Sequence, residues 1–164
     1  MKVIKKLGIV LFSLILTILD VSFFSAMPVH GATIVTTFLV AIVLSLLLSP
    51  ESLIIFAAGA VIFFSIFSSL PAWILIIGFF AIPEIVLYLR KTVVPEPTVP
   101  ISFFFFVITN FIFELLLLLF AKEFNSVGFS MLGYFVLLNS VAGTFLYFLM
   151  KSFRNRIKVF EVDI

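Results

Sequence analysis

The residues of this chain that could do chemistry are a few acidic and amide side chains inside long apolar stretches. Each is surrounded in the sequence mainly by Leu, Ile, Val, Phe and other apolar residues. A charged side chain at the centre of a membrane helix costs about 2.5–3.5 kcal/mol on insertion scales, so such groups face other helices or a partner rather than lipid. These candidate residues for packing or partner binding are Asp20, Glu84, Asn110, Glu114 and Asn139.

Two interpretations of this set are open. At a rise of 1.5 Å per residue, Asp20 and Glu114 lie at about the same depth, ~20 Å from the starts of their helices. They could form a carboxylate pair that handles protons or cations, with Asn110 and Asn139 as relays. Alternatively, these groups are protonated or hydrogen-bonded and fix helix packing. Transporters usually combine such carboxylates with broken helices and basic partners. Only Pro83 breaks a helix here, so we favour packing.

Motifs for catalysis or metal binding are not found in the sequence. The chain has no Cys and one His, which excludes disulfides, thiolate sites and a His cluster for zinc or haem. It also has no Gly-rich phosphate loop, nucleophile elbow or HExxH motif. His30, in the segment "MPVHGA", is interpreted as a solvated loop residue. We therefore expect no enzyme activity, no metal site and no cofactor.

The elements that must position these residues are membrane helices. The 164 residues are 64% hydrophobic and 11% charged, whereas soluble domains have about 45–50% and about 25%. The apolar segments are too long and too little alternating for barrel strands, and lipid requires every backbone group to be satisfied internally. We predict a single all-α transmembrane domain over 1–164 with a short cytoplasmic tail, 151–164. Its six helices are predicted near 7–26, 32–49, 52–70, 72–89, 101–121 and 128–150.

The basic residues predict the orientation of these helices. If both termini are cytoplasmic, nine of the ten Lys and Arg residues lie inside and only Lys122 lies outside. This distribution follows the positive-inside rule and indicates a multi-pass membrane protein with its basic side in the cytoplasm. Because the positive charge follows the membrane topology, no nucleic-acid partner is expected. The nine residues are Lys2, Lys5, Lys6, Arg90, Lys91, Lys151, Arg154, Arg156 and Lys158.

Proline residues predict where the helices turn or bend. Pro71 follows "SSL" and suits the first turn of a new helix, which indicates a tight helical hairpin. Pro83 should bend the fourth helix. Glu84, directly after it, lies within reach of Arg90 or Lys91. The segment "RKTVVPEPTVP" is the only linker, and its three prolines make it extended and stiff.

Small and aromatic residues indicate the kinds of surface that the helices present. Ala57 and Gly59 in "AAGA" and Gly143 in "AGT" would let helix backbones approach closely. The 24 Phe residues would make wide, rigid faces for lipid or for another membrane protein. The tail 151–164 begins basic and ends in alternating residues. It is interpreted as a helix that runs into the headgroups and then frays, or as a strand that docks on a cytoplasmic partner.

The order of these features resembles the MreD family of the bacterial rod-shape (elongasome) system. "FAAGAVIFFSIFSSLPAWILIIGFF" (56–80) is similar to a Gly-containing third helix, a short hairpin and a further apolar helix. "VLLNSVAGTFLYFLMKSFRNR" (136–156) resembles the family's last helix with its Asn and basic end. The resemblance implies a non-catalytic scaffold in peptidoglycan elongation and cell shape. It also implies binding to the bitopic protein MreC and, through it, to MreB and to RodA with its penicillin-binding protein.

The same resemblance supplies alternatives. MreD-like proteins are similar in fold to the six-helix substrate-binding subunits (S components) of energy-coupling-factor transporters, so a small-solute-binding subunit is the first alternative. This alternative expects Asp20, Asn110, Glu114 and Asn139 to converge on a closed polar cavity that is reached from outside. The second alternative is a small accessory subunit of a larger membrane complex. In each case we expect lipid and other membrane proteins as partners, in a homo- or hetero-oligomer.

Overall fold

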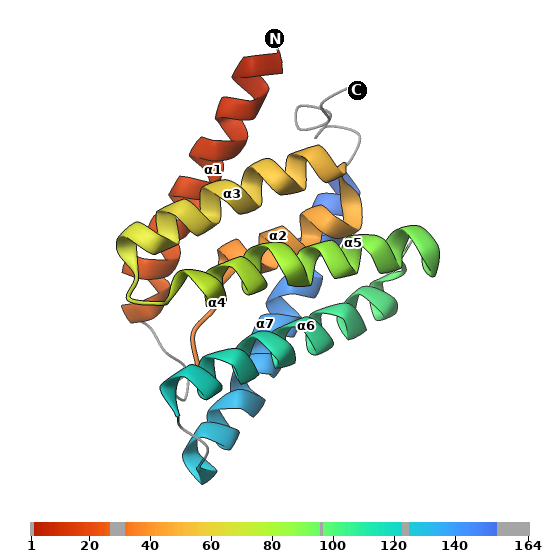
Figure 1. Ribbon diagram of the computed structural model, residues 1–164. Helices are drawn as coiled ribbons and strands as arrows, with labels where there is room; N and C mark the ends of the chain where they lie inside the picture. Colours follow the sequence, from red (N-terminus) through yellow and green to blue (C-terminus); the bar gives the residue numbers. More distant parts are fainter. Residues whose placement is uncertain (1, 27–31, 96, 123–124, 154–164) are drawn as a thin grey trace.

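The computed structural model shows helices packed around one short buried helix (Figure 1). It describes every residue except 1, 27–31, 96, 123–124 and 154–164, so His30 and most of the predicted tail lie outside the described residues. The helices are α1 (Lys2–Ser22), α2 (Thr36–Leu47), α3 (Pro50–Phe67), α4 (Ala72–Ile76), α5 (Ile82–Thr92), α6 (Val99–Ala121) and α7 (Ser126–Phe153). A 3₁₀ turn, Phe24–Ala26, follows α1, and a π-helical turn, Ile77–Ala81, joins α4 to α5.

The prediction of an all-helical membrane protein is confirmed at this level. Four helices of the described chain are long and apolar enough to cross a membrane: α3, the continuous helix Ala72–Thr92, α6 and α7. Helix α1 has a similar length of 21 residues but carries Asp20 and the amino-terminal lysines. Apart from the second, the helices lie within several residues of their predicted bounds.

The structure differs from the prediction most at the second segment, 32–49. Only Thr36–Leu47 is helical, and these 12 residues are ~18 Å long, against ~30 Å for the hydrocarbon core of a bilayer. Eleven of the 12 are buried, because α2 contacts α1, α3, α5, α6 and α7. The second predicted span is therefore a short central helix preceded by non-helical chain.

Phenylalanine rings fill the space around α2. Phe38 of α2 stacks on Phe113 of α6, with ring centroids 4.4 Å apart, and Phe64 of α3 stacks on Phe79 at 5.0 Å. Phe38, Phe79 and Phe113 are at most 2% exposed. We expected the Phe residues to make faces for lipid or for another membrane protein. Some of them form an aromatic core inside the protein instead.

The π-helical turn occurs where Pro83 was expected to bend the chain. Proline lacks a backbone N–H, and its ring clashes with the carbonyl four residues earlier, here that of Phe79. The turn Ile77–Ala81 absorbs this clash, and the helix then continues to Thr92. The predicted hairpin is also present, since α3 ends at Phe67 and α4 begins after Pro71.

Glycine residues lie where two helices approach closely. At Gly59 of α3 a Cβ atom would collide with the Ser13 side chain of α1. At Gly143 of α7 it would lie 2.5 Å from the Phe106 ring of α6. These contacts are consistent with the tight pairing of α1 with α3 and of α6 with α7. Ala57, which we also expected at a close contact, is 1% exposed.

Candidate functional site

Asp20 caps the amino-terminal end of α2. Its Oδ1 accepts a hydrogen bond from the Thr36 backbone N–H at 2.8 Å and another from the Thr36 hydroxyl, and its Oδ2 accepts one from the Thr37 N–H at 2.7 Å. The first N–H groups of a helix have no partner within the helix, and the helix dipole favours an anion there. Asp20 comes from the last turn of α1 and is 7% exposed, so it joins the two helices inside the protein.

Asn139 of α7 holds the non-helical segment that leads into α2. Its Oδ1 accepts the Val35 N–H at 3.0 Å, and its Nδ2 donates to the Thr33 carbonyl at 2.9 Å and to the Phe135 carbonyl at 3.1 Å. Asn139 is completely buried. A buried backbone that is not helical needs partners of this kind, because no water satisfies its N–H and C=O groups.

These contacts explain why the second helix begins later than predicted. We call Asp20, Asn139 and the groups of Thr33–Thr37 that they bind the α2 cap cluster. The carboxylate and the amide replace the hydrogen bonds that an additional helical turn would have made. The sequence contains a weak signal for this start, since Thr36 and Thr37 stand directly before an apolar run, although the N-cap residue itself is Val35.

Arg90 of α5 binds the opposite end of α2. Its Nη1 donates to the carbonyls of Ser45 and Leu48, each at 3.1 Å. The last carbonyls of a helix lack partners within the helix, and the dipole favours a cation there. We expected Glu84 to lie within reach of Arg90 or Lys91, and the bonds of Arg90 Nη1 direct that side chain to α2. An acidic residue of α1, Asp20, therefore lies at the start of α2, and a basic residue of α5, Arg90, lies at its end.

A second polar contact fixes the proline-rich linker to α7. The Tyr147 hydroxyl donates to the Pro97 carbonyl at 2.5 Å, and Lys151 Nζ donates to the same carbonyl at 2.9 Å. The Lys151 nitrogen also lies 5.5 Å from the centroid of the Tyr147 ring. Tyr147 and Lys151 are four residues apart on one helix, which places them on the same face. This spacing could have predicted the pair, but the sequence does not indicate the linker as its partner.

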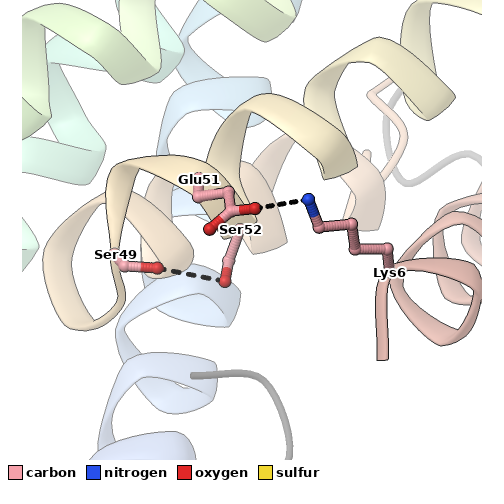
Figure 2. Close-up of polar contacts among 4 residues, drawn as sticks. All are labelled: Lys6, Ser49, Glu51 and Ser52. Atoms are coloured by element: carbon pink, nitrogen blue, oxygen red, sulfur yellow. Dashed lines mark hydrogen bonds and ion pairs between the residues drawn. The ribbon is translucent and has the colours of Figure 1, made fainter. Parts of the chain in front are cut away.

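An ion pair joins the starts of α1 and α3 (Figure 2). Lys6 Nζ lies 2.6 Å from Glu51 Oε1, and the Ser49 and Ser52 hydroxyls are 3.2 Å apart beside it. Lys6 joins the starts of α1 and α3, Arg90 joins the end of α5 to the end of α2, and Lys151 joins the end of α7 to the linker before α6. These helix ends therefore lie on one side of the molecule. We call this side, with Lys5, Lys6, Arg90, Lys91 and Lys151, the basic end.

The other predicted site residues lie outside the α2 cap cluster. Asn110 of α6 is completely buried, and its Nδ2 lies 3.4 Å from the Ser140 hydroxyl of α7, while its Oδ1 has no hydrogen-bond partner in the described chain. Glu114 is half-buried one turn further along α6. Glu84 is half-buried in the first turn of α5. The structure therefore brings Asp20 and Asn139 together around one segment and does not add the other three residues to it.

Two large cavities border this cluster. One, of about 370 Å³, lies beside Asp20 and is lined by Thr33, Phe64, Phe79 and Phe113, among others. The other, of about 450 Å³, lies between α1, α2, α3 and α7, and we call it the apolar groove. Residues along its length include Ile9, Leu16, Val40, Leu44, Leu146 and Phe153.

The site does not gather groups for metal binding, since the described residues contain no cluster of three or more His, Asp or Glu side chains suited to a metal ion. What the arrangement does chemically is to satisfy both ends of a buried helix. Comparison with family models, with curated proteins and with solved structures gives no match for this chain.

Proposed function

We propose that this protein is a non-catalytic scaffold subunit of the bacterial rod-shape and cell-wall elongation system. Six membrane segments with both termini cytoplasmic hold it in the inner membrane, and the second segment consists of α2 and the non-helical residues before it. The observation that supports this proposal most is the use of the buried polar groups, since Asp20 and Asn139 bind the backbone at the start of α2. The MreD-like order of features in the sequence supplies the biological setting.

The scaffold works through lateral contacts with other membrane proteins. Large apolar side chains cover the outer faces of α6 and α7, where Phe104 is 65% exposed and Phe145 is 61% exposed. Rigid aromatic faces of this kind suit the transmembrane helix of a partner as well as lipid. The partner we propose is an MreC-like bitopic protein, with RodA and its penicillin-binding protein joined through it.

The solute-binding alternative has less support from the contacts. It requires Asp20, Asn110, Glu114 and Asn139 to line one polar cavity. The cavity beside Asp20 is lined by none of the other three, and both oxygens of Asp20 already accept hydrogen bonds from α2. A small accessory subunit of a larger complex would use the same apolar faces, so it is distinguished by the identity of the partner.

Photo-crosslinking in the native membrane tests the proposal. A photoreactive amino acid is placed at Phe104 or Phe145 of the affinity-tagged protein, and the crosslinked products are identified by mass spectrometry. We expect a single-span MreC-like protein among them. The control position is Phe106, which is on the same helix as Phe104 but completely buried and should give no product. Recovery of a transporter ATPase pair or of a large cofactor-bearing complex instead would overturn the proposal.

A further inference from the structure

Glu114 places a carboxyl group within the apolar span α6 and has no partner for it. The helix Val99–Ala121 has its centre at Asn110, so Glu114 lies ~6 Å from the centre at 1.5 Å per residue. The hydrocarbon core extends ~15 Å to each side of the bilayer midplane, which puts this carboxyl at the depth of the lipid chains. In the described part of the chain, no hydrogen bond or ion pair involves it.

Glu114 lies on the outer side of the contact between α6 and α7. Phe113 of α6 stacks on Phe38 of α2, whereas Asn110 lies at the contact with α7, next to Ser140. At 3.6 residues per turn, Asn110 is about 60° around the helix from Phe113, and Glu114 is about 40° further in the same direction. The half-buried Glu114 is therefore on the side of this contact that faces away from α2.

Helix α7 presents apolar and small residues at the level of Glu114. The two helices lie side by side and run in opposite directions (Figure 1), with Asn110 next to Ser140. One turn further along α6, Glu114 is therefore level with the turn of α7 before Ser140, where Leu137 is 60% exposed. Gly133, one turn before Leu137, is exposed and has open space where a side chain would lie. The Glu114 seam, as we call this surface, consists of Phe111, Glu114, Gly133 and Leu137.

A basic side chain on another helix complements this seam. Ionisable groups inside membranes pair with one another, and a carboxylate only accepts hydrogen bonds, so its complement is a lysine or an arginine. The next basic residue along α6 is Lys122, which lies ~12 Å further along the helix axis and forms no ion pair with Glu114. Lipid chains offer no donor. The open space at Gly133 lets a second helix backbone approach closely.

We propose that the Glu114 seam binds a transmembrane helix of a partner protein that carries one lysine or arginine at the depth of Glu114. The ion pair selects this helix and sets its depth, because the surrounding apolar faces accept any apolar helix. The inference rests on the scaffold proposal, to which it adds the chemistry of the partner helix and the place where that helix docks.

Synthetic transmembrane peptides test this chemistry without knowledge of the partner. The chain has no native Cys, so Ser126→Cys, at an exposed position at the start of α7, carries a donor fluorophore. The purified protein is reconstituted in phosphatidylcholine vesicles. Three leucine-rich peptides with an acceptor fluorophore carry lysine, glutamine or leucine at one position near the centre, and energy transfer measures their association with the protein.

We expect the lysine peptide to associate about tenfold more tightly than the leucine peptide, the effect of one polar contact between membrane helices. Glu114→Gln keeps the size of the side chain but removes its charge, and should abolish the advantage of the lysine peptide over the glutamine peptide. Glu84→Gln, at a half-buried acidic residue of α5, is the matched control and should retain it. Equal association of the lysine and leucine peptides, or an advantage that survives Glu114→Gln, would overturn the proposal.

Photo-crosslinking from Leu137 tests the same seam in the native membrane. A photoreactive amino acid at Leu137 should crosslink to an apolar protein segment that contains a lysine or an arginine, and Glu114→Gln should lower the yield about tenfold. Crosslinks to lipid alone, or to a second copy of this chain, would overturn the proposal. If Leu137 gives only lipid while Phe104 or Phe145 still crosslinks to an MreC-like protein, the scaffold proposal stands and the assigned seam is wrong.

Discussion

At the scale of single residues, Asp20 is a carboxylate inside an apolar protein whose two oxygens accept three hydrogen bonds. The donors come from Thr36 and Thr37 at the start of α2. A proton- or cation-handling carboxylate needs a second titratable group or a polar path beside it. Glu114, the expected second member of such a pair, does not contribute to the α2 cap cluster. The contacts therefore favour packing as the role of Asp20.

Removing the Asp20 carboxylate should destabilise the protein. Asp20→Ala leaves buried donors of α2 without an acceptor, and we expect the free energy of unfolding to fall by about 1–3 kcal/mol. Asp20→Asn retains one acceptor oxygen and should lose less. Thermal unfolding in detergent, followed by Trp73 fluorescence, measures both changes. Leu19→Ala, at the exposed neighbouring position, is the control, and an equal loss for alanine and asparagine at position 20 would contradict the capping role.

At the scale of elements, α2 shows how a helix too short to span a membrane can lie buried among longer helices. Other helices surround its sides, and side chains from α1 and α5 satisfy its two ends. Asp20 at the start and Arg90 at the end both match the helix dipole. Because non-helical backbone at membrane depth is tolerated only within protein, the α2 cap cluster is what permits the break before Thr36.

Arg90 should therefore be more sensitive to substitution than its neighbour. Arg90→Gln removes the charged donor from the Ser45 and Leu48 carbonyls and should cost about 1.5–3 kcal/mol of the free energy of unfolding. Lys91→Gln, at an exposed position on the same helix, removes an equal charge and should have little effect. The same thermal unfolding measurement compares them. Similar midpoints for the two variants would indicate that the carbonyls of α2 do not need Arg90.

At the scale of the whole molecule, the described helices place most of their basic residues on one side. Lys6, Arg90 and Lys151 each join two segments there, through Glu51, the end of α2 and the Pro97 carbonyl. Lys122 follows the opposite end of α6. By the positive-inside rule, we propose that the basic end faces the cytoplasm.

Cysteine labelling measures this orientation, and the absence of native Cys makes the background clean. A membrane-impermeant thiol reagent should label Ser126→Cys in intact cells, because Ser126 begins α7 at the end opposite to the basic end. It should label Thr92→Cys, at the end of α5, only after the membrane is permeabilised. The reverse pattern would invert the topology, and labelling of both positions in intact cells would contradict a crossing by α6 between Thr92 and Ser126.

The helices were predictable from the sequence because their apolar runs and proline positions are local signals. Pro71 indicates the hairpin and Pro83 the disturbed turn at Ile77–Ala81, since each acts on its own stretch of backbone. The contacts of the polar residues were not predictable in this way. Asn139 binds groups more than 100 positions earlier in the chain, and Arg90 binds carbonyls more than 40 positions earlier. Such pairings depend on how the helices pack.

The sequence by itself determined that the protein is helical, apolar and charged mainly at one end, because composition and the spacing of charges set the solvent that each segment can tolerate. Only the tertiary structure decided that the second segment contains a short buried helix and that Asp20 and Arg90 satisfy its two ends. The apolar groove also exists only in the fold. An amino-acid sequence records which groups need hydrogen-bond partners, but the packing of distant helices decides which partners they find.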